Sequence, residues 1–505
     1  MGRLQLQPND KYNAELVNQT HPADWQNPTP AGKYNLVAIG GGSAGIISAL
    51  GTAGLGGKSA LIERHLLGGD CLNYGCVPSK AIIRASKVAH TVKHAAEYGI
   101  AIEGNVSVSF EEAMTRMRKL RSEISHHDSA ERFKSLGADV YLGQAKFTGP
   151  DTIEVNGQEL QFAKCVVATG GRASIPSIPG LEEAGYLTNE SLFSLTTLPK
   201  RIAVLGTGAI GAEMAQAFQR LGSQVFAVGR SPLPLSKEDP AAGEVLKQQF
   251  EQDGMQLYLR HTVEKVESSG DAKQITLKSG DSETVIEVDE ILVALGRQPN
   301  VEGLDLEKAN IQYNNKGLVV DDRLRTTNPK VYAAGDIAGS YQFTHAADAM
   351  ARICLQNALF HGRGKLSQLN VPRTTYTSPE VAHVGITPQQ ALKQGIEIDS
   401  YREDMANVDR AILDGQTSGF AVIHTQKGKG KVLGATIVGP HAGEMISEIT
   451  LLMNSGKPLS LLASTIHCYP TQAEVLKRIA DQYQKTKLTP FVKNLFYKWL
   501  AWNRK

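Results

Sequence analysis

Residues 34–63, YNLVAIGGGSAGIISALGTAGLGGKSALIE, decide the fold of this 505-residue chain. The stretch has the pattern of a strand, a glycine turn, a helix and a second strand, which predicts a βαβ unit with a parallel sheet. Gly40, Gly42 and Gly45 fit G-x-G-x-x-G, and Glu63 stands at the end of the second strand. Small residues let a pyrophosphate approach the N-terminus of the helix, and the acid can accept hydrogen bonds from an adenosine ribose. The stretch therefore predicts a dinucleotide-binding domain.

Residues 68–80, GGDCLNYGCVPSK, follow this unit and place Cys71 and Cys76 five positions apart. A turn between them can bring their Cα atoms to the separation of about 4.4 to 6.8 Å that a disulfide needs. Cys76 precedes a helix expected to begin near Pro78, where the helix dipole and the nearby Lys80 should lower a thiol pKa. Beside a redox cofactor, such a pair can pass two electrons to an acceptor.

The composition excludes several other classes of function. Lys and Arg number 53 against 51 Asp and Glu, and a net charge of +2 argues against a nucleic-acid-binding protein. Five cysteines in 505 residues are too sparse for a secreted disulfide scaffold, so the pair indicates a reactive dithiol in a reducing compartment. The first residues lack the apolar segment of a secretion signal, and we expect a cytoplasmic protein.

A second βαβ pattern occupies residues 201–230, RIAVLGTGAIGAEMAQAFQRLGSQVFAVGR. Its glycines predict a second nucleotide site. The strand-end position that would carry an acid is Gly229, and Arg230 follows it. With no carboxylate to repel a 2′-phosphate and a guanidinium to bind one, the pattern favours NADPH, and NADH stays an alternative. Arg230 as an ordinary solvated strand-end residue is the other interpretation.

The two glycine fingerprints and the cysteine pair occur in order with ATGGR (168–172), ALGRQPN (294–300) and AAGD (333–336). This ordered set resembles the flavin disulfide reductases, or class I pyridine nucleotide-disulfide oxidoreductases, which include glutathione reductase, dihydrolipoamide dehydrogenase and mercuric reductase. The resemblance implies an α/β fold with two Rossmann-like domains, for FAD and for NAD(P), and an α+β C-terminal dimerisation domain. The expected parts are an N-terminal arm (1–32), an FAD-binding domain (33–180 and 299–368), an NAD(P)H-binding domain (181–298), an interface domain (369–487) and an amphipathic basic helix (488–505).

The resemblance also implies roles for individual residues. Cys76 would be the thiolate next to the flavin, and Cys71 the outer sulfur that exchanges with the acceptor. Lys80 would lie beside the flavin with Glu213 as its buried carboxylate partner, and Asp336 would bind the ribityl chain. No resident metal site is expected. The residues expected to bind the cofactors are Gly40, Gly42, Ser43, Gly45, Glu63, Gly69, Lys80, Thr169, Gly170, Gly206, Gly208, Gly211, Arg230, Gly296, Arg297, Gly335 and Asp336.

The segment HCYPTQAE, residues 467–474, departs from the thiol-reducing relatives. Those relatives have a histidine immediately before the proline, paired with a glutamate five residues on, whereas this chain has Tyr469 and retains Glu474. Tyrosine titrates at about 10 and histidine at about 6.5, so tyrosine is the poorer general base at neutral pH. His467 is an alternative base. In a homodimer, Tyr469 and Glu474 would approach the partner's thiols.

A tyrosine at this position resembles the mercuric reductases. This chain ends AWNRK, without the C-terminal cysteine pair that those enzymes use to receive Hg(II), and soft metals need thiolate ligands. Other acceptors therefore stay open, namely a disulfide, a quinone, a reactive oxidant or another metal ion. We expect a homodimeric, FAD-dependent NAD(P)H oxidoreductase of the mercuric-reductase-like branch, with a non-enzymatic, redox-responsive flavoprotein as the alternative.

The two ends of the chain lie outside the nucleotide-binding patterns. The first 32 residues are polar and interrupted by Pro22, Pro28 and Pro30, which predicts an extended arm. Residues 488–505, LTPFVKNLFYKWLAWNRK, place aromatic residues at three- and four-residue steps beside lysines, which predicts an amphipathic helix. This helix is either a packing or dimer element or a peripheral contact with a membrane surface.

Overall fold

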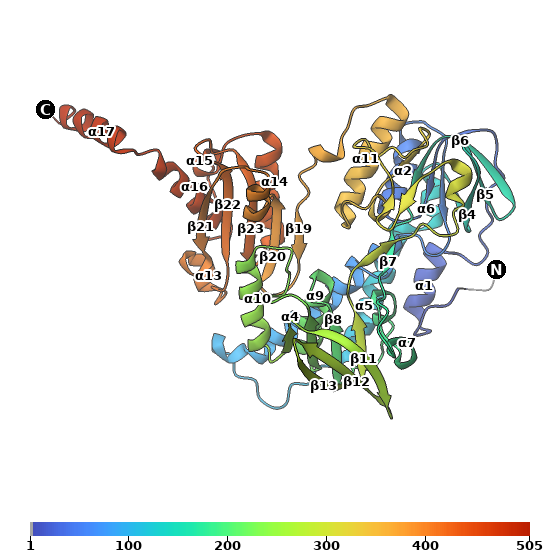
Figure 1. Ribbon diagram of the computed structural model, residues 1–505, viewed down its shortest axis with the longest axis horizontal. Coiled ribbons are helices and arrows are strands. Elements are labelled where there is room, and N and C mark those ends of the chain that lie inside the picture. Colours follow the sequence, from blue (N-terminus) through green and yellow to red (C-terminus); the bar gives the residue numbers. More distant parts are fainter. Residues whose placement is uncertain (1–3, 505) are drawn as a thin grey trace. The chain divides into compact units, whose positions relative to one another are not determined.

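A computed structural model describes residues 4–504 (Figure 1). Among these residues the chain separates into two compact units. Unit 1 comprises residues 4–206, 217–230 and 261–369, and unit 2 comprises residues 207–216, 231–260 and 370–504. The boundaries expected between the FAD, NAD(P)H and interface domains stay predictions.

A seven-stranded sheet forms the centre of unit 1. Strand β1 pairs in parallel with β2 and β6, and the parallel part extends through β3 on one side and β18 on the other. Strands β5 and β4 continue from β6 in antiparallel order. The parallel order β3-β2-β1 is that of a nucleotide-binding half-sheet, as the glycine pattern predicts. The strands are β1 (Tyr34–Ile39), β2 (Ser59–Glu63), β3 (Ala138–Leu142), β4 (Ala145–Gly149), β5 (Thr152–Val155), β6 (Gln158–Val167) and β18 (Val331–Ala333).

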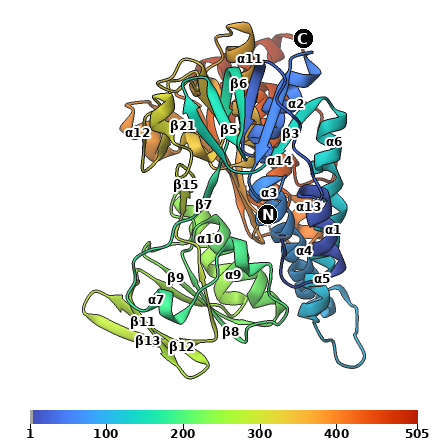
Figure 2. The ribbon, with the colours of Figure 1, turned by 90° about the vertical axis from the view of Figure 1, so that its right-hand side faces the viewer.

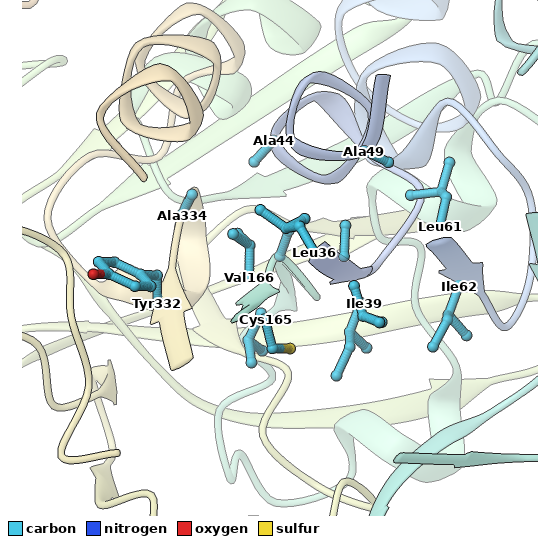
Figure 3. Packing of buried hydrophobic residues seen from close by; sticks show 14 of the residues in the cluster. Leu36, Ile39, Ala44, Ala49, Leu61, Ile62, Cys165, Val166, Tyr332 and Ala334 are labelled. Atoms are coloured by element: carbon cyan, nitrogen blue, oxygen red, sulfur yellow. The ribbon is translucent and has the colours of Figure 1, made fainter. Parts of the chain in front are cut away.

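Helix α2 (Ser43–Gly54) connects β1 to β2 and packs on both strands and on α11 (Thr344–Phe360). The strands are apolar on both faces because helices and loops cover both sides, so Leu36, Leu61 and Val166 are fully buried. Figure 3 shows these side chains filling the space between the strands and α2. This core holds the carboxyl ends of β1 and β2, where the nucleotide site is expected.

Helix α1 (Lys11–Thr20) corrects the expectation of an extended N-terminal arm. The Asp10 carboxylate accepts hydrogen bonds from the N–H groups of Tyr12 and Asn13 and so caps the helix. Leu16 is fully buried. The prolines that suggested an extended chain all follow the helix. Helix α1 packs on α5 (Phe110–Ser125), and α5 packs on α4 (Cys76–Lys93), as Figure 2 shows.

The second βαβ pattern also folds as predicted. Strand β8 pairs in parallel with β9 and β14, and α9 connects β8 to β9. Strands β11, β12 and β13 form an antiparallel sheet, and the short strands β7 and β15 pair antiparallel with each other. The elements are β7 (Gly171–Ala173), β8 (Arg201–Leu205), α9 (Ala209–Leu221), β9 (Gln224–Gly229), β11 (Thr262–Ser269), β12 (Ala272–Ser279), β13 (Ser282–Val288), β14 (Glu290–Val293) and β15 (Arg297–Pro299).

Unit 2 is built on a five-stranded antiparallel sheet in the order β19-β20-β23-β22-β21. Helix α14 packs on β20 and β23, and α16 packs on β21 and β22. This arrangement is the α+β domain that the sequence predicts. The elements are β19 (Arg373–Thr375), β20 (Glu380–Gly385), β21 (Ile398–Asp404), β22 (Phe420–Gln426), β23 (Val432–Gly439), α14 (Ala442–Ser455), α16 (Glu474–Thr486) and α17 (Pro490–Trp502).

Shorter elements complete the two units. None of the helices within residues 4–504 is both long and apolar enough to cross a membrane. The shorter elements are α3 (Gly69–Asn73), α6 (Ala130–Ser135), α7 (Leu181–Ala184), α8 (Asn189–Leu192), α10 (Pro240–Gln252), β10 (Gln256–Leu259), β16 (Tyr313–Asn314), β17 (Gly317–Leu318), α12 (Pro388–Lys393), α13 (Asp409–Leu413) and α15 (Ser460–Ser464).

Candidate active site

In the turn between β1 and α2, two glycine positions lie so close to neighbouring backbone atoms that no side chain would fit there. A Cβ atom at Gly45 would lie 1.8 Å from the carbonyl oxygen of Gly40. At Gly40, where φ is +109°, a Cβ would lie 2.3 Å from the carbonyl oxygen of Ala168. Gly42 precedes α2 without a side-chain cap, so the first N–H groups of the helix have no side-chain acceptor from that position. This cradle fits the pyrophosphate of a dinucleotide.

A cavity of about 50 Å³ lies at the carboxyl ends of β1 and β2, lined in part by Gly40, Glu63 and Thr169. The Glu63 carboxylate accepts hydrogen bonds from the N–H groups of Gly41 at 2.6 Å and His65 at 2.7 Å. Burial raises the pKa of this carboxyl group above its ordinary value. The acid therefore stands in a cavity at the strand ends, where a ribose hydroxyl is expected. The glycine cradle and Glu63 therefore fit the pyrophosphate and the adenosine ribose that FAD and the pyridine nucleotides share.

The three short motifs of unit 1 meet at Arg297. Its Nε donates to Asp336 at 3.1 Å, its Nη2 donates to the carbonyl of Gly171 at 2.6 Å, and its Nη1 lies 3.5 Å from Asp70. Burial raises the pKa of the Asp336 carboxyl. Burial alone would lower the pKa of Arg297, but the two carboxylates outweigh it and raise that pKa. The guanidinium thus holds Asp336 in a fixed orientation.

Thr169 and Gly170 belong to the same junction. The Thr169 hydroxyl donates to the carbonyl oxygen of Asn300 at 2.8 Å, and the Asn300 amide donates to the carbonyl oxygen of Thr169 at 2.9 Å. The Asn300 N–H donates to Gly170. Gly335 has φ of +82° and directly precedes Asp336, and Gly296 has φ of +130° and directly precedes Arg297. Both backbone conformations favour glycine.

Cys71 and Cys76 are both free thiols, and they hydrogen bond to each other. Cys71 lies in the short helix α3 and is half-buried. Cys76 is the first residue of α4 and is exposed. Its Sγ lies 3.3 Å from the hydroxyl of Thr344, the first residue of α11. The two sulfurs therefore lie within hydrogen-bonding reach of each other.

The pKa values of the two thiols move in opposite directions. The hydrogen bond with Cys71 is the main influence that lowers the pKa of Cys76 to about 6, and Thr344 and the charge of Lys80 lower it further. The same hydrogen bond, with burial second, raises the pKa of Cys71. Lys80 lies one helical turn after Cys76 on α4, which places the two side chains on the same face. Near neutral pH the thiolate is therefore on Cys76 and the proton is on Cys71.

The second nucleotide turn has the same backbone feature as the first. Gly206 has φ of +109°, and a Cβ there would lie 2.4 Å from the carbonyl oxygen of Ala294. Strand β9 ends at the buried Gly229, and Arg230 follows it with its side chain exposed. Gly208 and Gly211 lie in the turn and first turn of α9. The strand end thus carries a guanidinium and no carboxylate.

Glu213 lies on α9 and is 5% exposed. Its Oε1 accepts a hydrogen bond at 2.8 Å from the N–H of Tyr376, within unit 2. Lys80 belongs to unit 1. The expected pairing of Lys80 with Glu213 beside the flavin therefore stays a prediction.

Tyr469 and Glu474 belong to one polar network in unit 2. The Tyr469 side chain is exposed, and its hydroxyl donates to Asp409 at 2.8 Å. Arg478 lies 3.4 Å from Asp409 and 2.9 Å from Glu474, so it links the two carboxylates. The hydrogen bond to Asp409 raises the pKa of the Tyr469 phenol above its ordinary value. The phenol is therefore a still poorer base at neutral pH than the residue type alone suggests.

His467, the alternative base, contacts other residues than Tyr469 and Glu474 do. Its Nε2 lies 3.0 Å from the Glu448 carboxylate, its Nδ1 contacts the carbonyl of Thr465, and its side chain is 7% exposed. Cys468, next to it, is exposed. Within residues 4–504 no three His, Cys, Asp or Glu side chains gather as a candidate metal site.

Sequence reasoning did not find three polar side chains of these sites. Thr344 contacts Cys76 across 268 positions of sequence, and Asp409 contacts Tyr469 across 60. No local spacing reports such contacts. Asp70, the third of these residues, stands next to Cys71 in residues 68–80. An acid beside the cysteine was therefore the one signal in the sequence for the contact between Asp70 and Arg297.

Family models match most of the chain. Residues 34–351 match the pyridine nucleotide-disulphide oxidoreductase model, and residues 371–480 match the dimerisation domain of the same family. The chain belongs to the pyridine nucleotide-disulphide oxidoreductase family. Its members are NAD(P)H-dependent flavoprotein disulfide oxidoreductases, which confirms the predicted enzyme class and implies FAD and a pyridine nucleotide.

The relatives within the family include enzymes that are named for different substrates. The chain is 33% identical to a mercuric reductase of Bacillus cereus over 95% of this chain and 76% of that protein. It is 35% identical to a mercuric reductase of Lysinibacillus sphaericus (90% and 83%) and 32% identical to a dihydrolipoyl dehydrogenase of Chlamydia trachomatis (88% and 95%). Among solved structures, the HOCl-induced flavoprotein disulfide reductase RclA from Escherichia coli matches with a TM-score of 0.78 at 28% identity, covering 89% of this chain and 99% of RclA.

Proposed function

We propose that this protein is an NADPH-preferring oxidoreductase that passes two electrons through Cys71 and Cys76 to an acceptor, as a mercuric-reductase-like enzyme. The observation that carries the proposal is the inequality of the two thiols. Cys76, with its pKa lowered to about 6, is the thiolate next to the flavin, and Cys71, which keeps its proton, exchanges with the acceptor. Oxidation of the Cys76 thiolate and the Cys71 thiol forms one S–S bond, passes two electrons to the acceptor and releases the one proton that Cys71 carries.

The other residues of unit 1 bind and orient. FAD, when bound, supplies hydride chemistry between the nicotinamide and the cysteine pair. The turn at Gly40, Gly42 and Gly45 admits the pyrophosphate, and Glu63 accepts hydrogen bonds from the adenosine ribose. Asp336, held by Arg297, binds the ribityl chain.

Two observations support NADPH over NADH. Strand β9 ends in Gly229, which cannot repel a 2′-phosphate, and the exposed Arg230 is available to bind one. We therefore propose that Arg230 selects the phosphorylated nucleotide.

A soft metal ion is the acceptor that the comparisons favour. Mercuric reductases are among the relatives that cover nine-tenths or more of this chain, and RclA was solved as a Cu(II) complex. Cys76 is already a thiolate and Cys71 becomes one when it loses its proton on binding, and thiolates are the ligands that such ions prefer. Tyr469 stands where thiol-reducing relatives have a histidine, and its raised pKa disfavours proton transfer to and from a thiol substrate.

The dimerisation domain supports a homodimer. In this arrangement we propose that the exposed Tyr469, with Glu474 behind it, approaches the partner's cysteine pair. A protein that sedimented as a monomer with full activity would contradict this placement.

Anaerobic titration with NADPH, followed by a panel of acceptors, tests the function. The panel contains Hg(II), Cu(II), oxidised glutathione, lipoamide and a quinone. We expect turnover of a metal ion and loss of this turnover in both Cys71→Ser and Cys76→Ser, with NADPH still reducing the flavin. We further expect Cys76→Ser alone to abolish the long-wavelength absorbance of a thiolate next to the flavin. Metal turnover that survives in both variants would rule out the cysteine pair as the route.

The variant Tyr469→His tests the explanation for acceptor choice. It restores a side chain that titrates at about 6.5, and we expect turnover of oxidised glutathione or lipoamide to rise on the order of tenfold. Unchanged rates with both substrates would show that Tyr469 does not limit thiol chemistry.

A further inference from the structure

Helix α17 (Pro490–Trp502) is the last helix of the chain (Figure 1, red), and its large apolar side chains are in contact with solvent. None of residues 490–502, all of which the structure describes, is buried. Phe491, Trp499 and Trp502 are 77%, 58% and 66% exposed. A run of exposed aromatic residues of this size is typical of a surface that binds something. The redox chemistry proposed above does not use it.

The apolar residues of α17 lie on one half of the helix. Successive residues are separated by about 100° around the axis of an α-helix. On that spacing the apolar half contains Phe491, Val492, Leu495, Phe496, Trp499, Leu500 and Trp502, and the other half contains Lys493, Asn494, Tyr497, Lys498 and Ala501.

Lys493 and Lys498 occupy the two borders between these halves. A lysine at such a border can lay its methylene chain along an apolar layer while its ammonium group reaches polar surroundings. Aromatic residues on one side with lysines at both edges are the arrangement of a helix that lies in the interface of a bilayer.

The charge around α17 identifies the chemistry of the partner. Residues 482–505 contain six basic residues and no acidic one, whereas the remaining residues contain 47 basic and 51 acidic. A positive charge is thus concentrated on a segment that also exposes an aromatic face. The complementary surface is anionic and apolar, as in a bilayer that contains acidic phospholipids. A second α17 would instead place like charges together.

We propose that α17 binds the surface of a membrane that contains anionic phospholipids. The helix is about 20 Å long, shorter than the hydrocarbon layer of about 30 Å, so it lies along the surface and does not span it. The apolar half enters the headgroup region, and Lys493 and Lys498 bind lipid phosphates. This binding goes beyond the proposed redox function and does not depend on it.

Intrinsic fluorescence and flotation with vesicles test the proposal. Two of the three tryptophans, Trp499 and Trp502, lie in α17, and the third is Trp25. We expect a blue shift of tryptophan emission, and flotation of the holoenzyme, with vesicles of phosphatidylcholine mixed with phosphatidylglycerol. Vesicles of phosphatidylcholine alone should bind on the order of tenfold less, and high salt should reduce binding to the mixed vesicles.

Matched variants separate the contributions of the two halves. Because both residues are exposed, Trp499→Ala/Trp502→Ala should fold and should lower binding to mixed vesicles on the order of tenfold. Lys493→Gln/Lys498→Gln should remove the preference for phosphatidylglycerol. Tyr497→Ala, on the polar half, is the control and should bind as the parent does. Flavin reduction by NADPH should be the same in all four proteins, so a failure of the redox proposal is measured separately.

Three results would overturn the proposal. Equal binding to the two kinds of vesicle would remove the role of lipid charge. Absence of binding to both would show that α17 does not recognise lipid. A Trp499→Ala/Trp502→Ala protein that changed from dimer to monomer in analytical ultracentrifugation would assign the aromatic half to the subunit interface.

Discussion

Replacing Cys71 by alanine should raise the pKa of Cys76, because the hydrogen bond between the two thiols is the main influence that lowers it. That pKa is about 6 against an ordinary value of 9.0. Cys76 is exposed, so solvent screens part of the effect, and we expect a rise of about two units, not the full difference. At pH 7 the thiolate fraction would fall from about nine-tenths to about one-tenth.

The rate of alkylation measures this pKa directly. The reduced protein is treated with iodoacetamide over a range of pH, and modification of Cys76 is followed by mass spectrometry of its peptide. Only the thiolate reacts, so the midpoint of the rate profile gives the pKa. Thr344→Val is the comparison, because it removes a weaker influence and should move the midpoint less than Cys71→Ala does.

Two outcomes would refute the reasoning. One is a midpoint that stays near pH 6 in Cys71→Ala, which would assign the low pKa to the helix N-terminus and Lys80. The other is a larger shift in Thr344→Val than in Cys71→Ala, which would make Thr344 the main partner of the thiolate.

Three further predictions concern other parts of the chain. Gly45→Ala should lower the ratio of flavin to protein absorbance, because its Cβ would lie 1.8 Å from a carbonyl oxygen. Gly54→Ala in the same helix is the control and should keep the flavin, because nothing lies within 4 Å of a Cβ there. Equal flavin content in the two variants would contradict this explanation. Arg230→Ala should raise the KM for NADPH on the order of tenfold with little change for NADH in steady-state assays, and equal effects on both would remove the 2′-phosphate explanation. Burial lowers the pKa of His383, in strand β20, from 6.5 to about 4. Between those pH values only the unfolded chain takes up the proton. The free energy of unfolding should therefore fall by about 3 kcal/mol as the pH drops from 6.5 to 4. Urea unfolding at neutral pH and near pH 4 should show a smaller loss in His383→Gln, and the same loss would refute the assignment.

The parts of the fold that were predicted correctly depend on local pattern. The glycines of the two nucleotide turns stand beside buried strands, and both turns require backbone approaches that a Cβ would block. The expectation of an extended N-terminal arm was wrong for residues 11–20, which form a helix. The prolines were given more weight than the Asp10 cap and the apolar Leu16, which stabilise this helix before Pro22. Local signals for that helix were present in the sequence.

The polar partners of the site residues were not predictable in the same way. Tyr469 was recognisable from its position before a proline, but Asp409, which raises its pKa, comes from a distant segment. Arg297 and Asp336 were each assigned from a motif, and their ion pair arises only when two strand ends meet in space. Such pairs are set by tertiary packing, and a single sequence has no spacing that reports them.

The pairing of β7 with β15 has a consequence for how this chain can be altered. Ala173 lies opposite Arg297 in that pairing, so the residues that enter and leave segment 174–296 are neighbours. Because its ends are adjacent, this segment can be exchanged for a segment of the same fold whose ends are equally close. If Arg230 selects NADPH as proposed, exchanging residues 174–296 for the same segment of an NADH-dependent relative should change the preferred electron donor in one graft. The seven-stranded sheet of unit 1 and the cysteine pair lie outside that segment and would keep their residues.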